Sequence, residues 1–157
     1  MRVFDAKEIF KFAIRIEENG MKFYRYAAVI TDDDEIRKTF NFLASEEARH
    51  KEIFEGLLSE VTKDTAFETY PDEYFNYLKT YVDNVIFTDK QFEEAMSDIK
   101  DTLSAIDFAI KRELDSILYY HEIKRFVPEK QHNLLDEIIE EERKHYTKLI
   151  DIKENYT

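Results

Sequence analysis

Apolar residues recur along this chain at intervals of three and four, which is the spacing of one face of an α-helix. In the first part of the chain, the pattern predicts a helix that begins at Asp5, where Asp-Ala-Lys-Glu resembles a capping box, and continues past Tyr26 to an acidic break at residues 31–34. A second helix is predicted from about Asp34 to Val61. Because the break is short, we expect these two helices to be antiparallel neighbours.

The second part of the chain repeats this arrangement after a long connection. From residue 71 to about residue 99 the periodicity is weaker and aromatic side chains crowd together, which predicts one or two short helices that cross the bundle. We expect these aromatic residues to form a lid over the bundle or a subunit contact. A third helix should begin near residue 101 or 102 and stop before Pro128, and a fourth should carry Pro128 in its first turn and reach nearly to Tyr156.

The composition agrees with long amphipathic helices. The chain has only two glycines and two prolines, so residues that favour turns are few. Of its residues, 37% are charged and 43% are hydrophobic. We therefore predict an all-α fold, an antiparallel four-helix bundle with a long crossover between helices two and three. Because no low-complexity linker interrupts residues 1–157, one domain is the simplest expectation.

The second and fourth predicted helices carry the same stripe of residues at a constant offset of 95 positions. The first stripe is Phe40, Leu43, Glu47, His50, Phe54 and Leu57, and the second is Leu135, Ile138, Glu142, His145, Leu149 and Ile152. Each stripe lines one helix face, so burial should drive it inward although its middle is Glu-x-x-His. A buried carboxylate needs a positive partner, and a metal ion provides one.

Helices one and three repeat in the same way at an offset of 96 positions. Their stripes are Phe10, Ile14, Glu17, Met21 and Tyr24, and Ile106, Ile110, Glu113, Ile117 and Tyr120. Small residues flank both stripes, Ala13 and Gly20 against Ala109 and Ser116, and would let these helices approach closely. The chain is therefore predicted to be two similar helical hairpins related by approximate two-fold symmetry.

Together the four stripes predict one cluster of ligand side chains in the bundle interior that holds two metal ions. The candidate ligands are Glu17, Glu47, His50, Glu113, Glu142 and His145. This is the ligand arrangement of di-iron and di-manganese carboxylate bundles, and oxygen and imidazole ligands suit iron or manganese. Four ionised glutamates also balance the charge of two divalent ions. We expect two iron ions, with manganese or a mixed pair as alternatives.

The motif by itself is weakly specific, because Glu129 and His132 form a third copy near the start of helix four. We interpret His132 as solvated or capping and His121 as a surface or packing residue. The adjacent acids Glu18, Glu46, Glu140 and Glu141 are interpreted as ion-paired surface residues, with local register able to place one of the last three behind a ligand. Tyr24 and Tyr120 either form hydrogen bonds near the centre or deliver protons to it, or they simply pack in the core.

Charge and cysteine content exclude several functions. A formal net charge of −12 disfavours nucleic acid and anionic membranes as partners, and no apolar run is long enough to span a bilayer. The N-terminal sequence mixes acids into what would be the apolar part of a signal peptide, so we expect a cytoplasmic protein. Because the sequence contains no cysteine, disulfides, thiol catalysis and cysteine-ligated metals are ruled out within these residues.

Four stretches surround the candidate ligands: EENGMKFY from Glu17 to Tyr24, SEEARH from Ser45 to His50, ELDSILYY from Glu113 to Tyr120 and EEERKH from Glu140 to His145. In these stretches, and across essentially the whole chain, the sequence resembles rubrerythrin-type, ferritin-like proteins. The resemblance implies a ferritin-like bundle whose di-iron centre reacts with hydrogen peroxide or dioxygen, and which usually assembles as a dimer or larger homo-oligomer. The resemblance also implies an oxidoreductase that takes part in the response to oxidative stress.

The sequence departs from rubrerythrins at two points. Cys 0 excludes the rubredoxin domain that feeds electrons to the centre, so an external donor such as a rubredoxin-like protein would be required. Ser116 occupies the position of an extra glutamate, so the ligand exchange linked to that residue is not implied. Peroxide or dioxygen reduction is the leading hypothesis, iron binding with ferroxidase or storage activity is the alternative, and a metal-free helical interaction module is the third.

Overall fold

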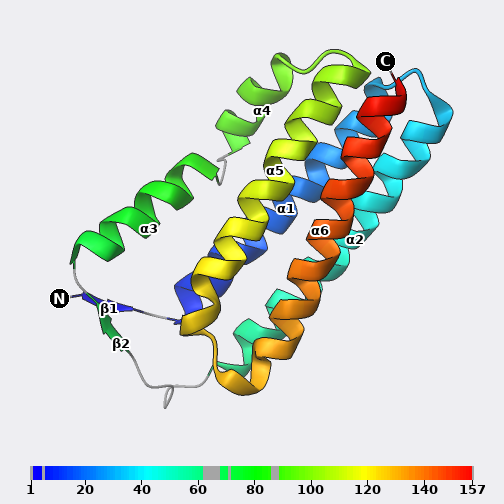
Figure 1. Cartoon of the computed structure of the whole chain (residues 1–157). Coiled ribbons are helices and arrows are strands. Elements are labelled where there is room, and N and C mark those ends of the chain that lie inside the picture. Colours follow the sequence, from blue (N-terminus) through cyan, green and yellow to red (C-terminus); the bar gives the residue numbers. More distant parts are fainter. Residues whose placement is uncertain (1, 5, 62–67, 71, 86–88, 157) are drawn as a thin grey trace.

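Four long helices form an antiparallel bundle in the computed structural model, which describes residues 2–4, 6–61, 68–70, 72–85 and 89–156 (Figure 1). The bundle helices are α1 (Ala6–Ile30), α2 (Asp34–Glu60), α5 (Thr102–Ile123) and α6 (His132–Tyr156). α1 packs on α2 and α5 packs on α6, so each hairpin predicted from the repeat is present. The predicted all-α four-helix bundle is confirmed.

Aspartate side chains cap two of these helices at the predicted breaks. The Asp33 carboxylate accepts a hydrogen bond from the backbone N–H of Ile36 at 3.0 Å and so begins α2. Asp101 accepts one from Ser104 at 2.8 Å and forms a capping box at the start of α5. These bonds satisfy N–H groups that have no partner within the helix, which explains why the helices begin there. The predicted cap at Asp5 lies outside the described residues.

The crossover from α2 to α5 contains two shorter helices, α3 (Asp72–Val85) and α4 (Asp89–Ser97), which run from one end of the bundle to the other (Figure 1). Leu78 and Val82 of α3 are buried in the core. Tyr81 stacks on Tyr119 of α5 with ring centroids 6.1 Å apart and donates a hydrogen bond to the Asp115 carbonyl oxygen. The described part of α3 therefore covers the bundle, as the predicted lid requires.

Two local features differ from the sequence-based expectation. Pro128 does not lie in the first turn of the last helix; its ψ of 138° is extended, and it precedes a 3-10 turn, η2 (Glu129–Gln131), that leads into α6. A first 3-10 turn, η1 (Lys124–Phe126), ends α5. A pair of short antiparallel strands, β1 (Arg2–Phe4) and β2 (Glu68–Tyr70), was not predicted, because three-residue strands carry too little periodicity.

The bundle core is divided into two apolar halves by a polar layer. One half contains Phe10 of α1, Phe54 of α2 and Tyr119 of α5, and the other contains Phe23 of α1 and Phe40 of α2. Along each bundle helix, the glutamate of the predicted stripe falls between the two halves. Apolar packing on both sides thus holds the polar layer at a fixed height and away from water. None of the described helices is long and apolar enough to cross a lipid bilayer.

Candidate metal centre

Carboxylate and imidazole side chains converge from all four bundle helices in the polar layer. They are Glu17 of α1, Glu47 and His50 of α2, Glu113 of α5, and Glu142 and His145 of α6. Each is at most 4% exposed to solvent. The structure therefore brings together every residue that the sequence predicted as a metal ligand.

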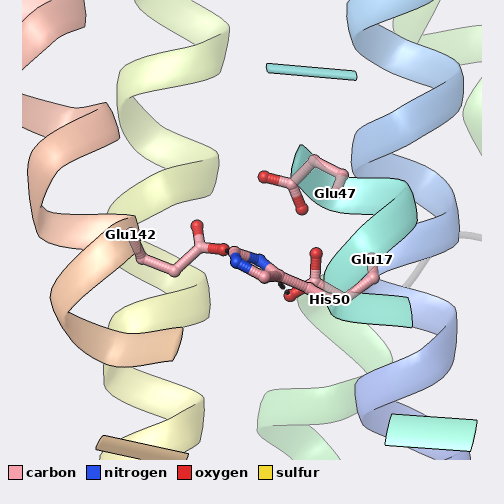
Figure 2. A group of neighbouring side chains, drawn as sticks. All are labelled: Glu17, Glu47, His50 and Glu142. Atoms are coloured by element: carbon pink, nitrogen blue, oxygen red, sulfur yellow. Dashed lines mark ion pairs between the residues drawn. The ribbon is translucent and has the colours of Figure 1, made fainter. Parts of the chain in front are cut away.

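These side chains form two overlapping groups, within each of which one possible ligand atom per residue lies within 4.8 Å of the others. The first group is Glu17, Glu47, His50 and Glu142, and the second is Glu47, Glu113, Glu142 and His145. Figure 2 shows the first group, with Glu142 reaching from α6 toward His50 and the glutamates of α1 and α2. Glu47 and Glu142 belong to both groups, which is the arrangement expected of carboxylates shared between two ions.

Six buried polar atoms of this layer have no hydrogen-bond partner. The unpartnered atoms are Oε2 of Glu17, Oε2 of Glu113, both carboxylate oxygens of Glu142, and Nδ1 of His50 and His145. Nδ1 of His50 lies 2.7 Å from Oε1 of Glu142, but without the geometry of a hydrogen bond. Elsewhere in the described residues, only Oε1 of Gln131 is similarly buried and unpartnered. Because buried polar atoms are normally satisfied, this facing set of electron-pair donors fits a pair of metal ions.

The carboxylates strongly perturb one another. Burial raises the pKa of Glu47 and Glu113 well above the usual value, and neighbouring carboxylates raise it further. Burial, with the charges of Glu47 and Glu17, raises the pKa of Glu142 to about 7. Burial also acts to raise the pKa of Glu17, but hydrogen bonding and the nearby His50 charge outweigh it and lower the pKa. Without a cation between them, several of these carboxyl groups therefore hold protons.

The two histidines respond differently to the same cluster. Burial opposes a charge on His50, but the carboxylates of Glu17 and Glu142 outweigh burial and raise its pKa. Burial lowers the pKa of His145 to about 4, and the charge of His50 lowers it further. Their rings stack 6.0 Å apart, with both Nδ1 atoms close to cluster carboxylates. His145 is thus neutral near pH 7, the form that binds metals.

Two tyrosines hold two of the glutamates from the opposite hairpin. The Tyr24 hydroxyl donates to Oε1 of Glu113 at 2.5 Å, and the Tyr120 hydroxyl donates to Oε1 of Glu17 at 2.5 Å. Burial and the nearby carboxylates raise the pKa of both tyrosines well above the usual value, so both remain protonated donors. Of the alternatives left open by the sequence, the structure supports hydrogen bonding to the centre.

Glu141 also reaches the centre, although its neighbour Glu142 is the residue on the predicted stripe. Oε2 of Glu141 lies 2.6 Å from Nε2 of His50, and it also pairs with Arg49. The sequence placed Glu141 among surface acids because its position is off the buried face of α6, but allowed that one of Glu46, Glu140 and Glu141 could lie behind a ligand, and the structure shows that Glu141 does. The Glu141 side chain is 30% exposed and extends from α6 to α2. Helical periodicity alone cannot predict this contact between two helices.

Gly20 makes room for one of the shared carboxylates. A Cβ atom at this position would lie 2.9 Å from Oε2 of Glu47. The sequence predicted that Gly20 would let helices one and three approach closely, but the group that a Cβ atom here would meet is the Glu47 side chain of α2. The small residue thus sets where this carboxylate can lie.

The other predicted surface residues lie outside the centre. His132 is half-buried and pairs with the Val127 carbonyl oxygen at 2.7 Å, while His121 is exposed. Glu18 forms an ion pair with Lys22 at 3.5 Å. These positions confirm that the third Glu-x-x-His copy is not part of the cluster.

Comparison with known proteins agrees with this geometry. The rubrerythrin family model matches residues 8–153. The crystal structure of a protein from Thermotoga maritima, described as a ferritin-like diiron-carboxylate protein, is 28% identical with a TM-score of 0.77 and covers 100% of this chain and 99% of that chain. A hypothetical protein from Pyrococcus furiosus is 21% identical with a TM-score of 0.68 over 96% and 89% of the two chains, and supports the fold alone. No curated protein matches. The chain therefore belongs to the rubrerythrin family.

Proposed function

We propose that this protein is a di-iron carboxylate oxidoreductase that reduces hydrogen peroxide or dioxygen with electrons from a separate donor. The observation that carries the proposal is the cluster of buried, unpartnered carboxylate and imidazole atoms in two overlapping groups. Family membership and the likeness to a protein described as a diiron-carboxylate protein favour iron over other metals. Four glutamates with two divalent ions would also be electrically balanced in this dry layer.

Each cluster residue has a distinct role in the proposed centre. Glu47 and Glu142 are shared between the two positions, while Glu17 and His50 serve one position and Glu113 and His145 serve the other. Two bound iron ions would supply Lewis acidity and the two electrons that peroxide needs to become water. The apolar halves on either side exclude bulk water from the centre.

Tyr24 and Tyr120 are the proposed proton relays. Reduction of one peroxide to two waters consumes two protons with the two electrons, and the dry layer offers few other O–H groups. Each hydroxyl is buried and already bonded to a carboxylate, Tyr24 to Glu113 and Tyr120 to Glu17. A proton that a cluster carboxylate gives up can therefore be replaced from the tyrosine along a preformed hydrogen bond. Because the pKa of the tyrosine is raised, the tyrosine must in turn be reprotonated.

The proposed partners follow from the composition of this chain. Because Cys 0 excludes a rubredoxin-type site in these residues, we propose that a rubredoxin-like protein delivers electrons. We further propose a homo-oligomer, with a dimer favoured. Size measurement in solution tests the assembly, and reduction of the iron-loaded centre by candidate donors tests the partner.

Anaerobic reaction with peroxide tests the proposed activity. Protein loaded with ferrous iron is mixed with hydrogen peroxide, and the growth of ferric absorption is followed by stopped flow. We expect oxidation much faster than that of free ferrous iron, and loss of this rate in His50→Ala and Glu142→Ala. His132→Ala is the matched control, because His132 also follows a Glu-x-x-His pattern but lies outside the cluster. A rate equal to that of free iron rejects the enzymatic proposal.

Iron oxidation and storage form the second candidate function. Ser116 is buried on α5 at the position where the resemblance to rubrerythrins implies an extra glutamate, and a serine cannot exchange as a carboxylate ligand. Iron retained well above two ions per chain in a large assembly would favour storage. Metal that is absent after purification and cannot be reconstituted would instead favour a helical interaction module.

A further inference from the structure

We propose that the two metal positions are inequivalent, and that the position beside His50 fills first because Glu141 holds the His50 imidazole from the opposite hairpin. This inference rests on the proposed metal-binding function and assigns an order of occupancy to that centre. Glu141 acts through His50 and is therefore a positioning residue.

The two ring nitrogens of His50 face different groups. Nε2 lies 2.6 Å from Oε2 of Glu141, whereas Nδ1 lies 2.7 Å from Oε1 of Glu142 and 3.5 Å from Oε1 of Glu17. When a metal ion displaces the proton on Nδ1, a carboxylate at Nε2 holds the remaining proton there, and the lone pair of Nδ1 is directed toward the centre. Such a bond fixes the ring orientation and increases the basicity of the metal-binding nitrogen.

Arg49 fixes Glu141 in this position. Its guanidinium pairs with Oε2 of Glu141 on α6 and donates from Nε to Oε2 of Glu46 on its own helix at 3.0 Å. The planar guanidinium can hold two carboxylates at once, so Glu141 is anchored although its side chain is 30% exposed. The network thus runs from Glu46 through Arg49 and Glu141 to His50.

The repeat does not reproduce this network at the other histidine. The offset of 95 that takes His50 to His145 relates Glu46 to Glu141, and Arg49 to Lys144. A symmetric centre would therefore have Glu46 bonded to His145, but Glu46 is instead bonded to Arg49. Within the described residues, no carboxylate is hydrogen-bonded to Nε2 of His145. Lys144 has a single ammonium group in place of the planar guanidinium of Arg49, so it cannot hold two carboxylates in the same way.

The surroundings of His145 are also less restrictive than those of His50. Its ring meets Phe42 edge-on with centroids 6.3 Å apart, and Phe42 is 46% exposed. An imidazole that is held only by packing must lose more rotational freedom when it binds an ion. His50 is already oriented, so the first ion gains most from the position that contains it.

Stepwise cobalt binding tests the proposed order. The protein is titrated with Co²⁺ by calorimetry, and the hyperfine-shifted imidazole N–H protons are followed by NMR in water. We expect a tighter and a weaker step, and one exchange-protected N–H signal, absent from His50→Ala, at one equivalent. Glu141→Ala should weaken the tighter step by about 10- to 100-fold and broaden this signal, as expected for loss of a carboxylate behind a ligand histidine.

Two further variants separate positioning from folding. Glu141→Gln keeps an oxygen acceptor without the charge, so its affinity should lie between those of the parent and Glu141→Ala. Glu46→Ala is the matched control, because it removes the repeat-related carboxylate and the other partner of Arg49 but leaves the Glu141–His50 bond. Because Arg49 still pairs with Glu141, Glu46→Ala should weaken the tighter step much less than Glu141→Ala does. Thermal unfolding of the metal-free variants checks that each one folds.

The outcomes distinguish this inference from the proposed function. Two equal or inseparable steps in the parent, or equal effects of Glu141→Ala and Glu46→Ala, would overturn the inequivalence and leave a two-metal centre intact. Failure of the parent to bind any Co²⁺ or Fe²⁺ would overturn the metal centre and the inference together.

Discussion

Tyr120 of α5 donates its hydroxyl to Oε1 of Glu17 of α1 at 2.5 Å, and the internal repeat reproduces this bond between Tyr24 and Glu113 with the helices exchanged. In each glutamate, Oε2 remains buried and unpartnered. Each tyrosine therefore holds one oxygen in place while the other stays available to a metal ion. Because each bond joins α1 to α5, the two hairpins are tied together at the centre itself.

The first prediction concerns Tyr120→Phe. Loss of the hydroxyl leaves a buried carboxylate oxygen without its donor, which should lower the free energy of unfolding of the metal-free protein by about 1–3 kcal/mol. It should also weaken metal binding, because Glu17 is no longer oriented. Urea unfolding and metal titration measure the two effects.

Tyr119→Phe is the matched control for this variant. Its hydroxyl donates to the backbone carbonyl oxygen of Ile9 at 3.1 Å and does not bond to the cluster. This change should affect stability but leave metal affinity unaltered. Equal losses of metal affinity in both variants would show that Tyr120 acts only through general packing.

The second prediction is that the metal-free protein loses stability as pH rises from 6.5 to 8. The raised pKa values of Glu47, Glu113, Glu142 and His50 mean that the folded chain keeps protons that the unfolded chain releases. The unfolded state thus binds fewer protons, so the free energy of unfolding falls with rising pH. His145 acts in the opposite direction, but only between about 4 and its ordinary value of 6.5.

Bound metal should reverse this trend, because an ion competes with protons for the same ligand atoms. The difference in melting temperature between metal-loaded and metal-free protein should therefore widen from pH 6.5 to 8. Thermal unfolding with and without a chelator measures it. A constant difference over this range would contradict the assignment of these carboxylates as ligands.

The fold and the six clustered residues could be predicted from sequence because both depend on helical periodicity. Glu47 and His50 lie three positions apart on an apolar stripe, so any helix that buries Phe40 and Phe54 must also bury them. The offset repeat then locates the equivalent pair on α6. Burial of Tyr24 follows from the same periodicity, although its hydrogen-bond partner does not.

Features that depend on side-chain reach or on local backbone geometry could not be predicted. Glu141 lies off the buried face, and only the packing of α6 against α2 brings its carboxylate to His50. Pro128 suits both a first helical turn and an extended residue before a 3-10 turn, and the sequence does not distinguish the two. The extent of a single domain over residues 1–157 stays a prediction.

The third prediction uses the two glycines of the chain, both of which lie inside helices. Gly20→Ala places a Cβ atom 2.9 Å from Oε2 of Glu47, so this shared carboxylate must move. The expected result is weaker metal binding by about tenfold or more, equivalent to about 1.4 kcal/mol. The metal-free protein should unfold with little change, because the higher helix propensity of alanine offsets the displaced side chain.

Gly56→Ala is the control, since a Cβ atom there has no neighbour within 4 Å. This variant should be more stable by about 0.5–1 kcal/mol, because alanine loses less conformational freedom than glycine in a helix, and its metal affinity should not change. Metal titration and urea unfolding of both variants separate helix propensity from displacement of Glu47. If Gly20→Ala binds metal as tightly as Gly56→Ala, the position of Glu47 does not govern the centre and its role as a shared ligand is refuted.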